Sequence, residues 1–195
     1  MLTDIILIGP YGAGKSTLAE LLAERLNWHH YLLDAERSRY LKEMGEYNID
    51  IANQMDKWEL SSPKWQRYNI YFVERFLDEH ADSDENCVLD LGAGHSVYKD
   101  PRFRSRAKQI FAPYPNVVLI LPSKNVEESL ELLLNQVRNH GLKGRTLSDE
   151  QIIRDNRFFL ENPSNYELAK FIVYTRGKTP GETCDEIYQV VCSRP

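Results

Sequence analysis

Short, continuous apolar runs separated by longer amphipathic segments dominate the sequence. Four of these runs are rich in Val, Ile and Leu and cover residues 5–8, 88–91, 117–121 and 171–174. Continuous rather than alternating apolar residues are typical of strands buried on both faces, as in a parallel sheet. A weaker fifth run, Tyr31-Leu32-Leu33, ends at Asp34.

The segments between these runs carry apolar residues at helical spacing. Four amphipathic helices are predicted in this way, over residues 18–26, 66–80, 126–137 and 182–192. Strands that alternate with helices indicate βαβ units, a parallel sheet and right-handed crossovers. The pattern therefore predicts an α/β fold.

Two segments interrupt this alternation. Residues 45–65 mix aromatic, acidic and amide side chains without a clear period, and residues 139–150 combine two glycines with basic and polar residues. Ser148, with Gln151 three positions later, is a helix-capping pattern. Long irregular segments in a compact α/β domain are usually functional loops, so we expect a substrate-binding insert within about 45–80 and a lid at about 139–150.

Composition narrows the class of protein without indicating its chemistry. The chain has 195 residues and a net charge of −5, which fits one domain over 1–195 and argues against a nucleic-acid or anionic-membrane surface. No apolar stretch is long enough to span a bilayer, and the first residues lack the basic start of a signal peptide. Three cysteines form no metal-ligand spacing or disulfide framework, so a cytoplasmic protein is expected.

The most specific motif directly follows the first apolar run. Residues 9–16, GPYGAGKS, match G-x-x-x-x-G-K-[ST], and Thr17 comes next. Glycines at Gly9, Gly12 and Gly14 let successive amide N–H groups, that of Ala13 included, turn toward a phosphate. Lys15 supplies a charge for the β- and γ-phosphates, Ser16 supplies a hydroxyl for Mg²⁺, and the following helix adds its N-terminal dipole. Nucleotide binding is predicted, but no particular reaction.

Two carboxylates follow at the ends of other predicted strands, where ligands bind in open parallel sheets. Asp90 interrupts an apolar strand, which is costly unless it meets a cation or hydrogen-bond donors. It is therefore a candidate ligand of Mg²⁺ or of a Mg²⁺-bound water, with backbone capping as the alternative. Asp34 either orients or deprotonates an acceptor hydroxyl, or caps the helix that contains Arg37 and Tyr40.

Taken together, these residues resemble the shikimate kinase family of P-loop enzymes. The resemblance covers most of the chain and is strongest over 5–26, at 32–34, at 89–94 and at 175–181. It implies a five-stranded parallel sheet in the order 2-3-1-4-5, flanked by helices and carrying a lid. It also implies ATP and Mg²⁺ as cofactors and a small-molecule acceptor.

The same resemblance assigns roles to further residues. An acidic pair near Mg²⁺ and the substrate hydroxyls corresponds to Asp34 and Glu36, and backbone contacts to substrate correspond to Gly92-Ala93-Gly94. Arg145 matches the lid arginine that contacts the transferred phosphate. Arg138 and Pro180 fall where the family holds adenine.

The chain departs from the family where two arginines anchor the substrate carboxylate. One of these positions is Gln66 and the other is Glu161. An anion in place of a cation would repel a carboxylate, which argues against shikimate as the acceptor. Arg67, one residue after Gln66, and Arg157, one turn before Glu161, are candidate substitutes.

The sequence thus predicts an ATP-dependent kinase, monomeric or a small homo-oligomer, that transfers phosphate to a hydroxyl of a small metabolite. Lys15, Asp34 and Arg145 are the expected catalytic residues, with Ser16, Asp34 and Asp90 near the metal. Two alternatives stay open: a nucleotide or sugar-type kinase of the same group, and a nucleotide-binding regulatory protein without phosphotransfer.

Overall fold

The computed structural model describes residues 3–45, 60–81, 85–142 and 146–192. Its centre is a five-stranded parallel sheet in the order β2-β3-β1-β4-β5. The strands are β1 (Ile5–Ile8), β2 (His29–Leu32), β3 (Cys87–Asp90), β4 (Asn116–Leu121) and β5 (Phe171–Tyr174). The predicted strands, sheet type and strand order are therefore confirmed.

The three central strands are buried more completely than the two edge strands. Every residue of β1, β3 and β4 is buried, whereas the edge strands β2 and β5 have exposed or half-buried positions. The prediction for the second strand, at residues 31–33, starts two residues too late and ends one residue too late, because the strand begins at His29 and Leu33 begins a helix instead. The apolar side chain of Leu33 lies on that helix and is buried in the hydrophobic core.

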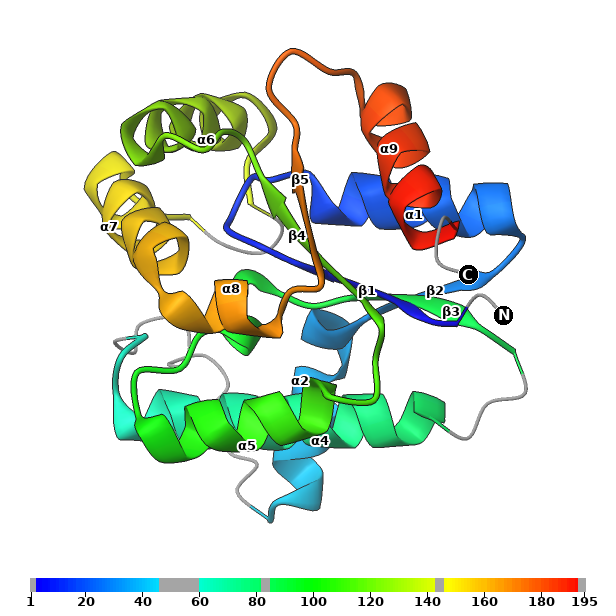
Figure 1. The fold of residues 1–195 in the computed structure, drawn as a ribbon. Coiled ribbons are helices and arrows are strands. Elements are labelled where there is room, and N and C mark those ends of the chain that lie inside the picture. Colours follow the sequence, from blue (N-terminus) through cyan, green and yellow to red (C-terminus); the bar gives the residue numbers. More distant parts are fainter. Residues whose placement is uncertain (1–2, 46–59, 82–84, 143–145, 193–195) are drawn as a thin grey trace.

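Helices cover both faces of the sheet (Figure 1). The helix α1 (Lys15–Leu26) packs against α9 (Pro180–Cys192) on one face. On the other face, α4 (Pro63–Ala81) contacts both α2 (Leu33–Glu43) and α5 (Pro101–Phe111). The remaining elements are the 3-10 helix η2 (Ala93–Ser96), α6 (Val126–His140), α7 (Asp149–Glu161) and α8 (Pro163–Leu168).

Helix termini follow the capping chemistry of the sequence. The predicted signal at Ser148 is a complete capping box, in which the Ser148 hydroxyl accepts from the backbone N–H of Gln151 and the Gln151 side chain accepts from that of Ser148. The sequence reading missed α5. Only Ala107 and Phe111 of this helix are fully buried, so its apolar stripe is too narrow to stand out.

All three cysteines are free thiols, with Cys87 and Cys184 buried and Cys192 exposed. Among the described residues, no helix is both long and apolar enough to cross a membrane.

Candidate functional site

The phosphate loop joins β1 to α1 at the carboxyl edge of the sheet. Gly14 precedes the helix with φ 86°, a left-handed conformation that residues with a Cβ rarely adopt. The loop lines a cavity of about 560 Å³ that extends to Asp34, Asp90, Gly92 and Ala93. The predicted nucleotide loop and both strand-end carboxylates thus share one cavity.

Lys15 lines the same cavity as the carboxylates of Asp34 and Asp90. Its Nζ donates to the backbone carbonyls of Gly9 (3.0 Å) and Pro10 (3.1 Å). Burial of the ammonium lowers the pKa of Lys15, and the negative charges of Asp90 and Asp34 oppose this shift. A desolvated cation beside loop N–H groups is suited to bind an anion such as a polyphosphate.

Asp90 and Ser16 form the second part of the site. The Ser16 hydroxyl donates to Asp90 Oδ2 at 2.6 Å, and Asp90 is only 1% exposed. Burial raises the pKa of Asp90, while the charge of Lys15 and the hydrogen bond from Ser16 lower it.

These oxygen donors fit Mg²⁺, which prefers hydroxyl and carboxylate oxygens and completes its shell with water and substrate phosphates. Among the residues the structure describes, no group of three His, Cys, Asp or Glu side chains could hold a metal ion by itself. Ser16 and Asp90 therefore suit a magnesium ion that arrives with a nucleotide.

Asp34 lines the same cavity as the loop, from the first turn of α2. Leu32 holds the N-cap position without a side-chain bond, so the alternative of Asp34 as the helix cap is wrong. The Asp34 carboxylate lies against Gly92, where an added Cβ would come within 2.7 Å of its Cγ. Its Oδ1 is 3.8 Å from His95 Nδ1 and 3.9 Å from Arg37 Nη1.

A second cavity, of about 300 Å³, adjoins the loop on the α9 side. Ala13, Thr17 and Pro180 line it, as does Gln136 of α6. Its mixed polar and apolar wall is of the kind that binds a nucleobase. Arg138, which the resemblance places at adenine, is not among its described lining residues. Arg138 instead forms a surface ion pair with Asp149.

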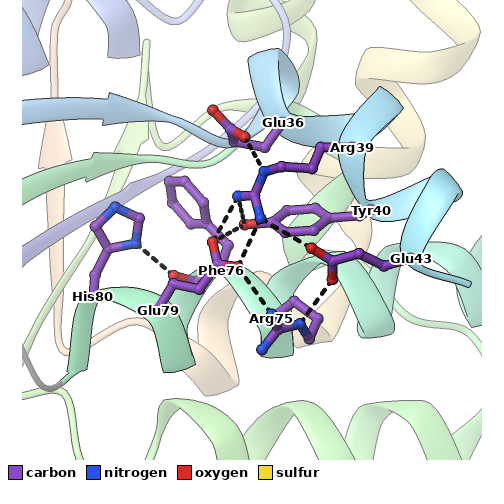
Figure 2. A network of polar contacts seen from close by, with 8 residues as sticks. All are labelled: Glu36, Arg39, Tyr40, Glu43, Arg75, Phe76, Glu79 and His80. Carbon is purple, nitrogen blue, oxygen red and sulfur yellow. Dashed lines mark hydrogen bonds and ion pairs between the residues drawn. The ribbon is translucent and has the colours of Figure 1, made fainter.

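The predicted substrate residues separate into two groups. Gly92 and Ala93 line the larger cavity, and Gly94 is buried against Trp65. Glu36 points away toward Arg39, whose Nε donates to Glu36 Oε2 at 2.7 Å (Figure 2).

The two candidate substitute arginines have other partners. Arg67 is exposed on α4, with its guanidinium over the ring of Tyr68. Arg157 donates to both carboxylate oxygens of Glu127, at 2.6 and 2.9 Å. Arg145 lies outside the described residues.

The two departures from the family also receive a structural explanation. Gln66 is 2% exposed; its Oε1 accepts from the backbone N–H groups of Lys99 and Asp100, both at 2.8 Å. The Glu161 carboxylate is 55% exposed and pairs with Arg157 at 3.4 Å, so it is held at the surface. Neither residue lines the described part of the larger cavity.

Sequence reasoning missed Asn156 and Gln136. Asn156 is buried in α7, and its side chain binds the backbone of Tyr11 in the phosphate loop. Gln136 lines both cavities. Neither residue belongs to a local motif, because each reaches the site only through the packing of distant elements.

Comparison with known proteins extends the resemblance to the whole chain. No family model matches it. A shikimate kinase from Sulfurihydrogenibium is 24% identical over 94% of this chain and 95% of that protein. One from Enterococcus faecalis is 26% identical over 95% of this chain and 96% of that protein. The chain is therefore similar to shikimate kinases over nearly its full length.

Solved structures agree with this relationship at the level of the fold. A shikimate kinase from Acinetobacter baumannii in complex with shikimate has a TM-score of 0.62 at 23% identity, covering 99% of this chain and 94% of that one. One from Bacteroides thetaiotaomicron has a TM-score of 0.66 at 15% identity, covering 98% and 99%.

The chain is also similar to kinases that are named for other substrates. A gluconokinase from Sinorhizobium meliloti has a TM-score of 0.58 at 16% identity, covering 97% of this chain and 91% of that one. A cytidylate kinase from Alkaliphilus oremlandii is 35% identical, but over only 42% of this chain and 39% of that protein. Similarity to this chain is therefore not confined to kinases named for shikimate.

Proposed function

We propose that this protein is an ATP-dependent kinase that transfers the γ-phosphate to a hydroxyl of a small metabolite. The observation that carries the proposal is the single cavity that joins Lys15 and Ser16 of the phosphate loop to the carboxylate of Asp34. A nucleotide bound at one end of this cavity would present its phosphate toward an acceptor at the other end. The kinase relatives support the same reaction class.

In this proposal, different residues would bind the nucleotide, hold the metal ion and orient the acceptor. Lys15 and the loop N–H groups would bind the β- and γ-phosphates, and the smaller cavity lined by Thr17, Gln136 and Pro180 would take the base. Ser16 and Asp90 would hold Mg²⁺, which supplies charge neutralisation between the phosphates when bound. Arg145 would contribute a further charge from the lid.

We assign the orientation of the acceptor hydroxyl to Asp34. Its carboxylate lies beside Gly92, and His95 Nδ1 and Arg37 Nη1 lie 3.8 and 3.9 Å from its Oδ1. It would orient the hydroxyl and accept its proton as the phosphate is transferred. Phosphoryl transfer depends mainly on positioning and charge, which these residues provide.

The proposal is tested by ADP release with Mg²⁺ATP and a panel of hydroxylated metabolites, each compared with the basal ATPase rate. We expect saturable stimulation by at least one metabolite and little or none by shikimate, given Gln66 and Glu161. ATP binding without stimulation by any metabolite would favour a regulatory nucleotide-binding protein instead.

A further inference from the structure

His95 is a buried histidine that lies beside the carboxylate of Asp34. Its side chain is 3% exposed, and its Nδ1 is 3.8 Å from Asp34 Oδ1. We propose that His95 is a positioning residue, which donates a hydrogen bond from Nδ1 to Asp34 and holds this carboxylate in place for the acceptor hydroxyl. The inference rests on the proposed kinase function and adds a residue to the acceptor side of its site.

The carboxylate of Asp34 needs a partner outside its own helix. Asp34 lies in the first turn of α2, and its side chain is 44% exposed. An exposed side chain changes rotamer within nanoseconds unless a contact holds it. The group that orients the attacking hydroxyl must stay in place, since a misplacement of about 1 Å can cost about 100-fold in rate. A fixed group beside Asp34 therefore bears directly on the rate of transfer.

The backbone around His95 is fixed on both sides. Its N–H donates to the carbonyl of Gly92 at 3.0 Å, and its carbonyl accepts from the hydroxyl of Tyr98 at 2.8 Å. Tyr98 is 1% exposed, and the ring of Trp65 packs so closely on Gly94 that an added Cβ would lie 2.9 Å from Cζ2. The segment η2 thus holds His95 independently of α2, so that its imidazole is a fixed point for a side chain on that helix.

The two side chains are slightly farther apart than a hydrogen bond allows. N–H···O bonds are about 2.9 Å long, so the 3.8 Å between Nδ1 and Oδ1 must shorten by about 0.9 Å. Catalytic hydrogen bonds often tighten in this way only when the substrate is bound. The bond requires that the proton of the neutral imidazole is on Nδ1, because the carboxylate of Asp34 only accepts.

The two oxygens of Asp34 have different neighbours. Oδ1 lies next to His95 and to Arg37, whose Nη1 is 3.9 Å away on the same helix as Asp34. Oδ2 is the atom nearest to an added Cβ at Gly92, which lines the larger cavity. With Oδ1 bound by the imidazole, Oδ2 would accept the proton of the acceptor hydroxyl.

Two polar substitutions separate the hydrogen bond from packing. The side-chain nitrogen of Asn lies two bonds from Cβ, as does Nδ1 of histidine, whereas that of Gln lies three bonds away, as does Nε2. His95→Asn should therefore keep kcat for acceptor-stimulated ADP release within about 5-fold of the wild-type value. His95→Gln should lower kcat at least about 30-fold, while ATP affinity and the acceptor KM change less than about 3-fold. A packing role predicts the opposite order, because Gln is closer to histidine in volume.

A double-mutant cycle tests whether His95 acts through Asp34. In the Asp34→Asn background, His95→Gln should lower kcat by less than about 3-fold further, because the carboxylate that it positions is already gone. Tyr114→Phe is the control variant. It removes the hydrogen bond from a half-buried hydroxyl to the Leu77 carbonyl, just before β4 at the amino edge of the sheet, and should leave kcat unchanged.

Heteronuclear NMR of the imidazole nitrogens measures the contact independently of turnover and of any folding defect in His95→Gln. The signal of His95 is assigned by its loss in His95→Asn. We expect Nδ1 to carry the proton in the wild-type protein, and we expect Asp34→Asn to shift its signal.

Four results would overturn the inference and leave the kinase proposal intact. They are wild-type kcat in His95→Gln, equal losses in the Asn and Gln variants, an undiminished effect of His95→Gln in the Asp34→Asn background, and an Nδ1 without a proton. ADP release that no metabolite stimulates would refute the kinase proposal and this role together.

Discussion

The side-chain amide of Asn156 in α7 binds both polar groups of the Tyr11 backbone. Its Oδ1 accepts from the Tyr11 N–H at 2.9 Å, and its Nδ2 donates to the Tyr11 carbonyl at 3.3 Å. The ring of Tyr11 also packs edge-on against Phe159, with ring centres 4.9 Å apart. The phosphate loop is therefore fixed by a helix far along the chain, adjacent to the expected lid.

Asn156→Ala should weaken nucleotide binding as well as stability. We expect a loss of about 1–3 kcal/mol in the free energy of unfolding, because a buried loop N–H loses its partner. ATP affinity should fall at least about 10-fold once the loop is no longer preformed. Urea unfolding and calorimetric ATP titration measure the two effects.

The matched control is Asn116→Ala. Asn116 is also buried, and its Nδ2 donates to the backbone carbonyls of Thr3 and Asp4 at the amino end of β4, the opposite edge of the sheet from the loop. It should lose similar stability and keep the wild-type ATP affinity. Equal ATP affinity in both variants would contradict the role of Asn156.

Gln66→Arg restores the residue type that the family resemblance implies, yet we expect it to destabilise the protein. The substitution leaves the N–H groups of Lys99 and Asp100 without their acceptor and buries a charge. The expected cost is about 2–4 kcal/mol in the free energy of unfolding. Arg67→Gln, at the exposed next position, should change stability by less than about 0.5 kcal/mol. Wild-type stability of Gln66→Arg would show that Gln66 has no structural role.

Glu79 makes part of the stability dependent on pH. Hydrogen bonding from Arg39 lowers the pKa of Glu79 from 4.5 to about 2, and the Tyr40 hydroxyl contributes further. Because the folded pKa is below the unfolded one, the stabilisation is complete above about pH 4.5 and is lost as the pH falls toward 2.

Glu79→Gln should therefore cost about 1–2 kcal/mol at pH 7 and almost nothing near pH 2, since partial exposure screens the interaction. Urea unfolding across this range measures it, with exposed Glu131→Gln as the control. A deficit that does not change with pH would indicate a packing effect instead.

Lys15→Met removes the positive charge of the phosphate loop and so tests the nucleotide site. We expect ATP affinity to fall at least about 100-fold, because the cation that would bind the phosphates is removed from a low-dielectric position. Lys108→Met, on α5 and paired with Glu167 at 3.0 Å, should bind ATP as the wild type does. Retained ATP affinity and turnover in Lys15→Met would refute the phosphate-loop assignment.

Local sequence patterns were sufficient to predict most of the fold and part of the candidate site. Continuous apolar runs identified the buried strands, and the spacing of Gly9 to Ser16 identified the phosphate loop, because both depend on neighbouring residues. The partner of Asn156 could not be predicted, since Tyr11 is distant in sequence and meets it only in the folded chain.

The site roles that the sequence assigned to Glu36, Arg138 and Arg157 also depended on contacts that the sequence does not reveal. Each lies near the expected position along the sequence, but a nearby opposite charge holds it at the surface in the described structure. Sequence position indicates which helix carries a charged side chain. The direction of that side chain depends on its ion-pair partners.

The most direct test of the central claim is detection of the phosphorylated acceptor itself. Wild-type protein, Mg²⁺ATP and the best metabolite from the panel should yield, by mass spectrometry, a product that carries one added phosphate in step with ADP release. Asp34→Asn should bind ATP normally and form this product at least about 100-fold more slowly, because it cannot accept the hydroxyl proton. ADP release without a phosphorylated metabolite, or undiminished product from Asp34→Asn, would contradict the account.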